Sequence, residues 1–566
     1  MKTMSNYEFD AIVVGSGITG GWAAKELTEA GLKVLLIERG RQITHGQDYA
    51  TETTPPWELP FHGAGDAALY DEKYPVQRRN RAFDEWTQGH FINDIDNPYS
   101  TAAGSEAFLW LRSYQLGGRS LTWGRQTYRW SDYDFEANKR DGHGTDWPIR
   151  YADLAPWYDH VEEFIGVSGS VECIAALPDG RFQPPMALNI VEQHVKSAIE
   201  GNFPDRRLII GRTANLTQEK EGRATCQNRN ICARGCSYGA YFSTQSSTLP
   251  AAQATGRLTL VTDTIVEAVE HDPATGKATG VLVVDANTGA RRRHTARLIF
   301  LNAGAFNSTH LLLRSRSAAF PNGLANSSGV LGTHIMDHAN AVSAVAIIPG
   351  FDQHTTYGNR PTGIVIPRFR NLDRNDAPRF TRGYSYQGGA FQGGWTGGKR
   401  MPGVGADFKA RLRTPQAWRM VLVTYAESLP LASNRLTLDP NRKDKHGMPV
   451  LQIAFQHGEN ERTALADAAA EAKAMLTAAG GQVVISITEP GLGGSSIHEM
   501  GGARMGWDPK TSVLDRFSRA HDVPNLFVTD GAQMSSSACQ NPSLTYMALT
   551  ARACHHAVSL LKQGSI

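Results

Sequence analysis

The segment EFDAIVVGSGITGGWAAKELTEAGLKVLLIERG, residues 8–40, constrains the fold most. An apolar run at 11–14 predicts a buried parallel strand, which breaks at a G-x-G-x-x-G motif. A helical pattern follows, and a second apolar run at 34–37 ends at an acidic residue. This order of strand, glycines, helix, strand and terminal acid predicts a dinucleotide-binding βαβ unit.

Each residue of the motif has a physical role beside a pyrophosphate. Gly15 permits the tight turn, Gly17 lets backbone N–H groups approach the phosphates, and Gly20 lets the helix pack against the strand. The helix N-terminus stabilises the phosphate charge. Glu38 is placed to accept hydrogen bonds from a ribose diol, which favours a 2′-hydroxyl over a 2′-phosphate. The motif alone leaves FAD and NAD open.

Charge and hydropathy exclude several classes of protein. The 57 basic and 55 acidic residues give a net charge of +2, so no global field attracts nucleic acid or an anionic membrane. No apolar window is long enough to cross a bilayer, and MKTMSNYEFD lacks the pattern of an export signal. We therefore expect a chain with no membrane span and no signal of its own. Cytoplasmic residence is the default, unless a partner carries the chain across a membrane.

Three further segments favour FAD over NAD. LGGRSLTWG at 116–124 can bring backbone amides against a phosphate or a flavin edge, and LIFLNAGAFNS at 298–308 reads as a buried strand that ends in small residues. Near the C-terminus, a strand at 526–528 and a turn at 530–532 precede Pro542, which suits a first helical position. The positive end of that helix would face the charge of a reduced flavin.

These segments, together with HEMGGARMG at 498–506 and CQNPS at 539–543, resemble the glucose-methanol-choline (GMC) oxidoreductases, FAD enzymes that oxidise alcohols and sugars. The likeness is closest to the bacterial sugar dehydrogenases: the flavin subunits of glucoside 3-dehydrogenases, glucose dehydrogenases, and gluconate or fructose dehydrogenases.

The resemblance implies an α/β chain of two domains, similar to p-hydroxybenzoate hydroxylase. A Rossmann-type FAD-binding domain would be assembled from discontinuous segments, at 1–45, 100–135, 215–340 and 490–566. A substrate domain of the α+β type, with an antiparallel sheet, would take 46–99, 136–214 and 341–489. Alternating patches at 434–438 and 450–455 predict a hairpin.

The resemblance also implies the cofactor contacts. We expect noncovalent FAD, because Thr122 stands where some relatives carry a flavin-linked histidine. The expected cofactor-binding residues are Gly15, Gly17, Gly20, Glu38, Arg39, Gly117, Gly118, Ser120, Trp123, Gly124, Val266, Ala303, Gly304, Ser308, Asp530, Gly531, Asn541, Pro542 and Thr545.

Oxidation of an alcohol needs a base for the hydroxyl proton and a donor that places the oxygen. Histidine suits this exchange near neutrality. Spacing alone favours a buried structural histidine at 498 and an N-cap asparagine at 541. The resemblance instead implies that His498 is the base and that Asn541 hydrogen-bonds the same oxygen. His334 and His338, in GTHIMDHA, are expected to have structural packing roles.

Three of the six cysteines lie in CQNRNICARGCSYG, spaced C-x5-C-x3-C. Three thiolates leave a conventional zinc or iron-sulfur site one ligand short, unless a histidine or Cys173 completes it. A disulfide or inert thiols are the other interpretations, and inert thiols suit Cys539 and Cys554. The resemblance implies a [3Fe-4S] cluster on Cys226, Cys232 and Cys236, which passes electrons toward a haem subunit.

The resulting hypothesis is an FAD-dependent dehydrogenase that oxidises a secondary hydroxyl of a sugar or glycoside, with a preference for C3 of glucosides. The expected partners are a small signal-bearing subunit, which would bring the chain to the periplasm, and a cytochrome c. The alternatives are an oxygen-using oxidase with structural cysteines, a non-catalytic electron-transfer subunit and a nicotinamide enzyme. Trp395 could stack on a sugar face, although a loop-supporting role is expected.

Overall fold

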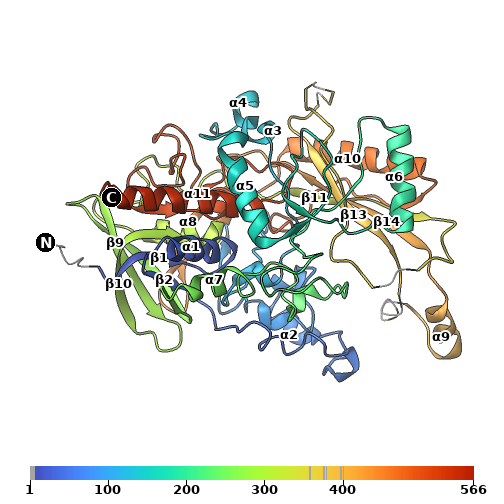
Figure 1. The fold of residues 1–566 in the computed structure, drawn as a ribbon, viewed down its shortest axis with the longest axis horizontal. Coiled ribbons are helices and arrows are strands. Elements are labelled where there is room, and N and C mark those ends of the chain that lie inside the picture. The colour runs from blue at the N-terminus through green and yellow to red at the C-terminus, as the bar shows by residue number, and fades with distance from the viewer. Residues whose placement is uncertain (1–6, 356–357, 374–375, 378, 395–397, 399–400) are drawn as a thin grey trace.

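The computed structural model describes residues 7–355, 358–373, 376–377, 379–394, 398 and 401–566 (Figure 1). Trp395 lies outside the described residues. Two large sheets lie toward opposite ends of the long axis in Figure 1. The first described residues, from Tyr7, and the C-terminal end of the chain lie beside the sheet that contains β1 and β10.

The first sheet has the strand order β7-β2-β1-β10-β9-β8, and β18 pairs with β10. The parallel part follows from the apolar runs: Val13 lies between Leu36 and Phe300. Its strands are β1 (Phe9–Val14), β2 (Val34–Ile37), β7 (Leu258–Val261), the second half of β10 (Arg291–Leu301) and β18 (Leu526–Val528). The strands expected at 11–14, 34–37 and 526–528 are confirmed.

The first half of β10 pairs with β9 (Lys277–Asp285), which in turn pairs with β8 (Thr264–Asp272), both antiparallel. Arg291 and Arg293 on this exposed ribbon pair with Glu267 and Glu270 of β8, on the far side of β9. The basic run at 291–294 therefore lies on a solvated hairpin edge.

α1 (Ile18–Glu29) flanks this sheet and packs against both α7 (Thr248–Ala254) and α11 (Ser543–Lys562). α5 (Tyr151–Ile165) packs on α11 and lies between the two sheets in Figure 1. α11 begins one residue later than expected, because Pro542 takes the N-cap position. α8 (Ala305–Arg314) follows β10.

The second sheet is antiparallel throughout, with the order β17-β11-β14-β13-β12-β6. Its strands are β6 (Ile209–Ile210), β11 (Ala339–Ile348), β12 (Ile364–Ile366), β13 (Tyr384–Gln392), β14 (Trp418–Ala426) and β17 (Gln482–Ile485). α6 (Ile190–Asn202) and α10 (Glu459–Ala478) pack against it. The core between them includes the buried rings of Tyr384, Tyr386 and Trp418. The predicted antiparallel sheet is thus present.

The predicted hairpin forms from β15 (Arg435–Lys443) and β16 (Pro449–Ala454). It lies outside both large sheets, in a small sheet with β3 (Ser100–Thr101). The domain boundaries given above remain predictions. The other elements are α2 (Ala67–Lys73), α3 (Asp132–Phe135), α4 (Ala137–Asp141), α9 (Gly405–Arg413), β4 (Val167–Ser168) and β5 (Phe182–Gln183).

None of the helices in the described part of the chain combines the length and the apolar character that a membrane span requires.

Candidate active site

The first glycine motif forms the turn between β1 and α1. Gly15 has a φ of +93°, which favours glycine, and a Cβ on Gly20 would lie 1.8 Å from the Gly15 carbonyl oxygen. Gly17 differs, because its φ is ordinary and a Cβ there would meet no atom within 4 Å. Gly15 and Gly20 are therefore required by the protein's own packing, whereas the space at Gly17 is open for a ligand.

The second glycine cluster faces the first. The Gly117 N–H donates to Ser16 Oγ at 2.8 Å, and a Cβ built on Gly118 would lie 3.5 Å from the Gly17 Cα. Ser120 Oγ donates to the Gly117 carbonyl at 2.6 Å and holds this turn. Two backbone segments that are far apart in the sequence thus approach each other at Gly17, as a pyrophosphate cradle requires.

Glu38 directly follows β2, contacts Ser16 of this cradle and is buried. Its carboxylate accepts hydrogen bonds from Ser16 Oγ at 2.5 Å and from the Gly40 N–H at 2.9 Å. Burial raises the pKa of this carboxyl. Beside it, the Arg39 guanidinium lies 3.8 Å from the centre of the Tyr114 ring, in a cation–π contact.

Asp530, in the predicted C-terminal segment, hydrogen-bonds to the predicted segment at 298–308. Its carboxylate accepts from Ser308 Oγ at 2.5 Å and from the N–H groups of Gly304 at 2.9 Å and Ala532 at 3.0 Å. The pKa of this buried acid is raised to about 6, mainly by burial. Ser308 Oγ also receives the Ala303 N–H at 3.1 Å. A Cβ on the adjacent Gly531 would lie 2.5 Å from the Glu499 carbonyl oxygen.

The remaining predicted cofactor residues are less closely grouped. Trp123 and Gly124 line the large cavity described below. Thr545 lies in the first turn of α11, where its hydroxyl is 2.8 Å from the Tyr158 hydroxyl. Val266 lies in β8, and its carbonyl accepts from Arg314. The cofactor roles of these residues stay predictions.

The predicted catalytic pair is brought together. Asn541 Nδ2 lies 3.0 Å from His498 Nε2, and Gln387 Nε2 donates to Asn541 Oδ1 at 2.5 Å. His498 is partly exposed and stands in the loop that follows β17, whereas Asn541 directly precedes Pro542 and α11. Burial, above all, holds the pKa of His498 well below 6.5. Its imidazole is therefore neutral at neutral pH and can accept a proton.

The structure adds two residues to the site, Asp337 and His338, which end the segment GTHIMDH before β11. His338 Nδ1 lies 2.8 Å from His498 Nδ1. The Asp337 carboxylate accepts the backbone N–H of His498 at 2.9 Å. We expected a packing role for His338 from the sequence, and that expectation did not include this contact. The one signal in the sequence is that His338 directly follows Asp337, in a polar stretch with apolar residues on both sides.

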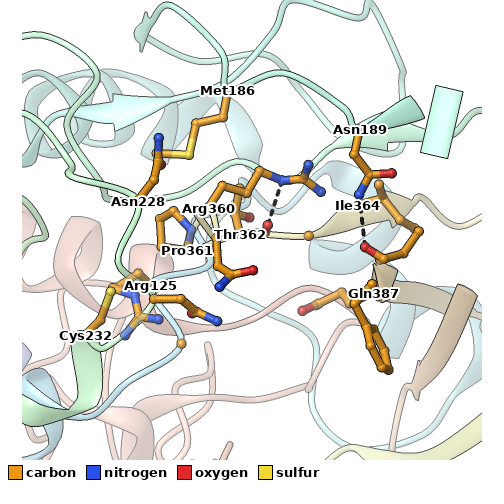
Figure 2. Close-up of a pocket in the computed structure, with 18 of the residues that line it drawn as sticks. Arg125, Met186, Asn189, Asn228, Cys232, Arg360, Pro361, Thr362, Ile364 and Gln387 are labelled. Atoms are coloured by element: carbon orange, nitrogen blue, oxygen red, sulfur yellow. Dashed lines mark hydrogen bonds between the residues drawn. The ribbon is translucent and has the colours of Figure 1, made fainter. Parts of the chain in front are cut away.

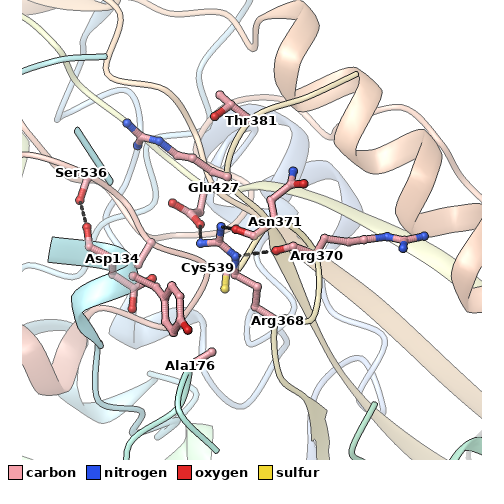
Figure 3. A network of polar contacts seen from close by, with 12 residues as sticks. Asp134, Ala176, Arg368, Arg370, Asn371, Thr381, Glu427, Ser536 and Cys539 are labelled. Carbon is pink, nitrogen blue, oxygen red and sulfur yellow. Dashed lines mark hydrogen bonds and ion pairs between the residues drawn. The ribbon is translucent and has the colours of Figure 1, made fainter. Parts of the chain in front are cut away.

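The segment that carries Asn541 is held from behind by a buried polar network (Figure 3). Arg368 donates to Glu427 at 2.8 Å, and both side chains are fully buried. Cys539 lies beside this pair in Figure 3, and its carbonyl accepts from Ser385 Oγ at 3.0 Å. Gln540 Nε2 donates to the Ala176 carbonyl at 3.0 Å. These bonds fix the backbone on which Asn541 is placed.

A cavity of about 1240 Å³ opens beside the pair (Figure 2). Gln387 is part of its wall and donates a hydrogen bond to Asn541, whereas Asn541 and His498 themselves are not among the residues that line the cavity. The walls combine polar and apolar side chains, and Figure 2 shows Asn189, Asn228 and Arg360 among the polar ones around the space. Cys226, Cys232, Trp123 and Gly124 line the same cavity.

All six cysteines are free thiols. Cys226 and Cys236 have raised pKa values, first through burial and then through their cysteine neighbours, including Cys232 in both cases. The three thiols of the C-x5-C-x3-C loop are therefore close enough to interact electrically. Glu52 supports the loop by pairing with Arg229 at 2.5 Å. Among the described residues, no three His, Cys, Asp or Glu side chains are arranged around a single metal ion.

The sequence matches the profiles of the GMC oxidoreductases over residues 9–340 and 430–550. The chain belongs to the GMC oxidoreductase family. Similar proteins are named as dehydrogenases of 2-methyl-1,2-propanediol and fructose and as a paromamine 6'-oxidase. This GMC oxidoreductase is accordingly an enzyme that oxidises a hydroxyl group.

Three relatives resemble it over nearly their whole length. The chain is 27% identical to 2-methyl-1,2-propanediol dehydrogenase of Mycolicibacterium austroafricanum, covering 97% of this chain and 95% of the relative. It is 27% identical to the fructose dehydrogenase large subunit of Gluconobacter japonicus, covering 98% of both. It is 25% identical to the gluconate 2-dehydrogenase flavoprotein of Pantoea cypripedii, covering 96% and 92%.

Solved structures share the fold. Pyridoxine 4-oxidase from Mesorbium loti superposes with a TM-score of 0.58 at 16% identity, over 97% of this chain and 98% of the other. Formate oxidase of Aspergillus oryzae gives 0.62 at 14% identity, over 99% of both. Membership of the GMC oxidoreductases and the open cradle at Gly17 together support FAD as the cofactor.

Proposed function

We propose that this GMC oxidoreductase is a dehydrogenase that oxidises a secondary hydroxyl of a sugar or glycoside to a ketone, with C3 of a glucoside as the preferred position. The observation that carries the proposal is the contact of Asn541 with His498 Nε2 at 3.0 Å, near a wide cavity with polar and apolar walls. The relatives named for fructose and gluconate act on sugars, and the C3 preference rests on the sequence resemblance alone.

A substrate hydroxyl can displace the hydrogen bond that joins Asn541 Nδ2 to His498 Nε2 and bind to both nitrogen atoms in its place. The substrate O–H donates to His498 Nε2, and its oxygen accepts a hydrogen bond from Asn541 Nδ2. As His498 takes the proton, negative charge grows on the oxygen, and the amide of Asn541 stabilises it. The carbon then loses a hydride with two electrons and a C=O bond forms. Bound FAD supplies the hydride acceptor.

We also propose a [3Fe-4S] cluster on Cys226, Cys232 and Cys236. A three-iron cluster needs one thiolate for each iron, so its cysteines need not converge on one atom. Three mutually interacting free thiols suit this requirement, and Arg125 lowers the pKa of Cys226. A thiolate-ligated cluster is anionic, and Arg229, beside Cys236, adds another positive charge.

The proposed cluster would act as a one-electron carrier toward a haem partner of the cytochrome c type. The names of two relatives, "large subunit" and "flavoprotein", support an assembly with further subunits. A small signal-bearing subunit would then bring the complex to the periplasm. The compartment rests only on the resemblance to the bacterial sugar dehydrogenases.

The test of the hydroxyl oxidation is anaerobic mixing of the purified holoenzyme with methyl glucoside, glucose, fructose and gluconate. We expect at least one sugar to bleach the flavin absorbance, and the oxidised carbon is then identified by NMR of the product. His498→Ala should keep its FAD but lose this bleaching, whereas His143→Ala, at an exposed histidine, should bleach normally. Full bleaching in His498→Ala would overturn the assignment. Stoichiometric peroxide in air would favour an oxidase.

A further inference from the structure

His338 is fully buried behind the catalytic histidine. Its Nε2 lies 3.1 Å from the carbonyl oxygen of Ser537 and 3.0 Å from that of Ala538. Its Nδ1 lies 2.8 Å from His498 Nδ1. Both ring nitrogens of His338 therefore have a partner within hydrogen-bonding distance: Nε2 faces two backbone carbonyls, and Nδ1 faces the ring of His498.

The two carbonyl oxygens determine where the proton of His338 is placed. A carbonyl oxygen can only accept, so Nε2 must carry the hydrogen. Burial lowers the pKa of His338 to about 4, so the ring is neutral at neutral pH and has only this one N–H. Its Nδ1 then presents a lone pair, and the hydrogen between the two Nδ1 atoms belongs to His498. If Nδ1 of His338 carried the hydrogen instead, the buried lone pair on its Nε2 would face the lone pairs of both carbonyl oxygens.

The same reasoning extends to the substrate side of His498. With its hydrogen on Nδ1, the neutral ring has a lone pair on Nε2, which accepts from Asn541 Nδ2 at 3.0 Å. Asn541 Oδ1 receives Gln387 Nε2–H at 2.5 Å. The hydrogen bonds therefore form a chain in which each group donates to the next. The chain starts at Gln387, passes through Asn541, His498 and His338, and ends at the carbonyls of 537–538. The fixed backbone end of the chain sets this direction.

We propose that His338 is a positioning residue that holds His498 in the Nδ1–H tautomer, so that its Nε2 lone pair faces the substrate hydroxyl. This inference rests on the proposed function, in which His498 is the base. It assigns to the segment GTHIMDH a role in the reaction and not in packing alone. Without the acceptor at 338, His498 could place its hydrogen on Nε2 and lose the lone pair that takes the substrate proton.

His338 orients the base without carrying the proton away. When His498 becomes an imidazolium, His338 Nδ1 continues to accept its Nδ1–H. The Nε2–H of His338 faces only carbonyl oxygens, which cannot take up a proton at neutral pH. The substrate proton therefore stays on His498 Nε2 until it leaves on the cavity side.

Two substitutions separate tautomer control from packing. In His338→Asn, Oδ1 can occupy the place of Nδ1 and still accept from His498, but the bond to the 537–538 carbonyls is lost. In His338→Gln, Nε2 can still donate to those carbonyls, but the acceptor for His498 is lost. Gln is also closer to His in size. A packing role thus predicts that Gln is the better replacement, and tautomer control predicts Asn.

The measurement is the rate constant for anaerobic flavin reduction at saturating sugar, in variants with equal FAD content. We expect His338→Gln to lose about 10²- to 10⁴-fold, the range typical of a misplaced catalytic base, and His338→Asn to stay within about tenfold of wild type. The reverse order, or equal losses, would overturn the proposal. A wild-type rate in His338→Gln with an inactive His498→Ala would reject this inference and leave the proposed function intact.

A second measurement needs no variant at 338 to fold. In holoenzyme with ¹⁵N-labelled histidine, the His498 signals are those that vanish in His498→Ala. We expect a protonated Nδ1 and an unprotonated Nε2 at neutral pH. The opposite pattern would contradict the proposal directly.

Discussion

The Asp337 carboxylate accepts the backbone N–H of His498 at 2.9 Å, so that consecutive residues, 337 and 338, hold the backbone and the ring of the proposed catalytic histidine. The second carboxylate oxygen of Asp337 accepts from the N–H groups of Gly494 at 2.8 Å and Ser496 at 3.3 Å. The buried Asp337 thus accepts hydrogen bonds from three backbone N–H groups of the loop that carries His498.

Replacing Asp337 by Asn should loosen this loop. One side-chain oxygen would become an NH₂ group that faces backbone donors, and leaving a buried donor unpaired costs about 1–3 kcal/mol. We expect the free energy of unfolding to fall by about that amount, with a slower flavin reduction. Urea unfolding monitored by fluorescence gives the first value. Asp352→Asn, at an exposed loop position, is the control, and equal stability of both variants would contradict the role of Asp337.

The pH dependence of kcat/KM should report the low pKa of His498. Only the neutral ring can accept the substrate proton. Because burial, His338, Arg119 and Arg81 all lower this pKa, the active form persists below pH 6.5. We therefore expect kcat/KM to be constant from neutrality down to about pH 6.5 and to fall only at lower pH.

Removing one of those positive charges should shift the acidic limb of the pH profile of kcat/KM. Arg81→Gln takes away a positive charge that disfavours the imidazolium, so the pKa of His498 should rise and activity should be lost at a higher pH. Arg207→Gln, at an exposed arginine of the α6–β6 connection, should leave the profile unchanged. A limb that does not move in Arg81→Gln would argue against a direct electrostatic effect on His498.

Gly17→Ala should weaken FAD binding without harming the fold. A Cβ there meets no protein atom, and the φ of −64° is ordinary for alanine. If the cofactor's pyrophosphate occupies this space, the methyl group should raise the FAD dissociation constant about tenfold or more. Titration of the apoprotein with FAD measures it. Gly201→Ala, where a Cβ also meets nothing, should bind FAD normally; equal affinities would place the pyrophosphate elsewhere.

Cys232→Ser should remove the proposed cluster. We expect wild-type protein, purified without oxygen, to contain about three iron atoms per chain, and the variant to contain almost none. Sugar should still bleach the flavin of the variant, but reduction of added cytochrome c should be lost. Cys173→Ser, at an exposed cysteine, serves as the control. Wild-type protein with flavin and no iron would end the cluster hypothesis.

The sequence predicted much of the nucleotide-binding half, because its signals are local. Apolar runs of strand length, glycines at fixed spacing and Glu38 lie within forty residues, and β1, α1 and β2 form there. The hairpin at 435–454 was likewise predictable from alternation around a turn. Its place in a separate small sheet with β3 was not, because strand pairing over long sequence separation leaves no local pattern.

The catalytic pair was identified through family motifs, and spacing alone favoured structural roles for both residues. His338 shows why. Its contact with His498 joins residues 160 positions apart and depends on where β11 and the loop after β17 meet. The segment GTHIMDHA has no periodicity that points to such a contact.

The sequence by itself determined the chemical equipment of this protein: the glycines for a nucleotide, the histidine and asparagine for a hydroxyl, and three closely spaced thiols. The tertiary structure decided how that equipment is oriented. It placed two glycine turns that are distant in the sequence next to each other at Gly17. It also placed the carbonyls of Ser537 and Ala538 where they end a chain of hydrogen bonds. The reason is physical: side-chain type fixes which bonds a group can make, but only folding fixes which partners are within reach, and so which nitrogen of His498 keeps its lone pair.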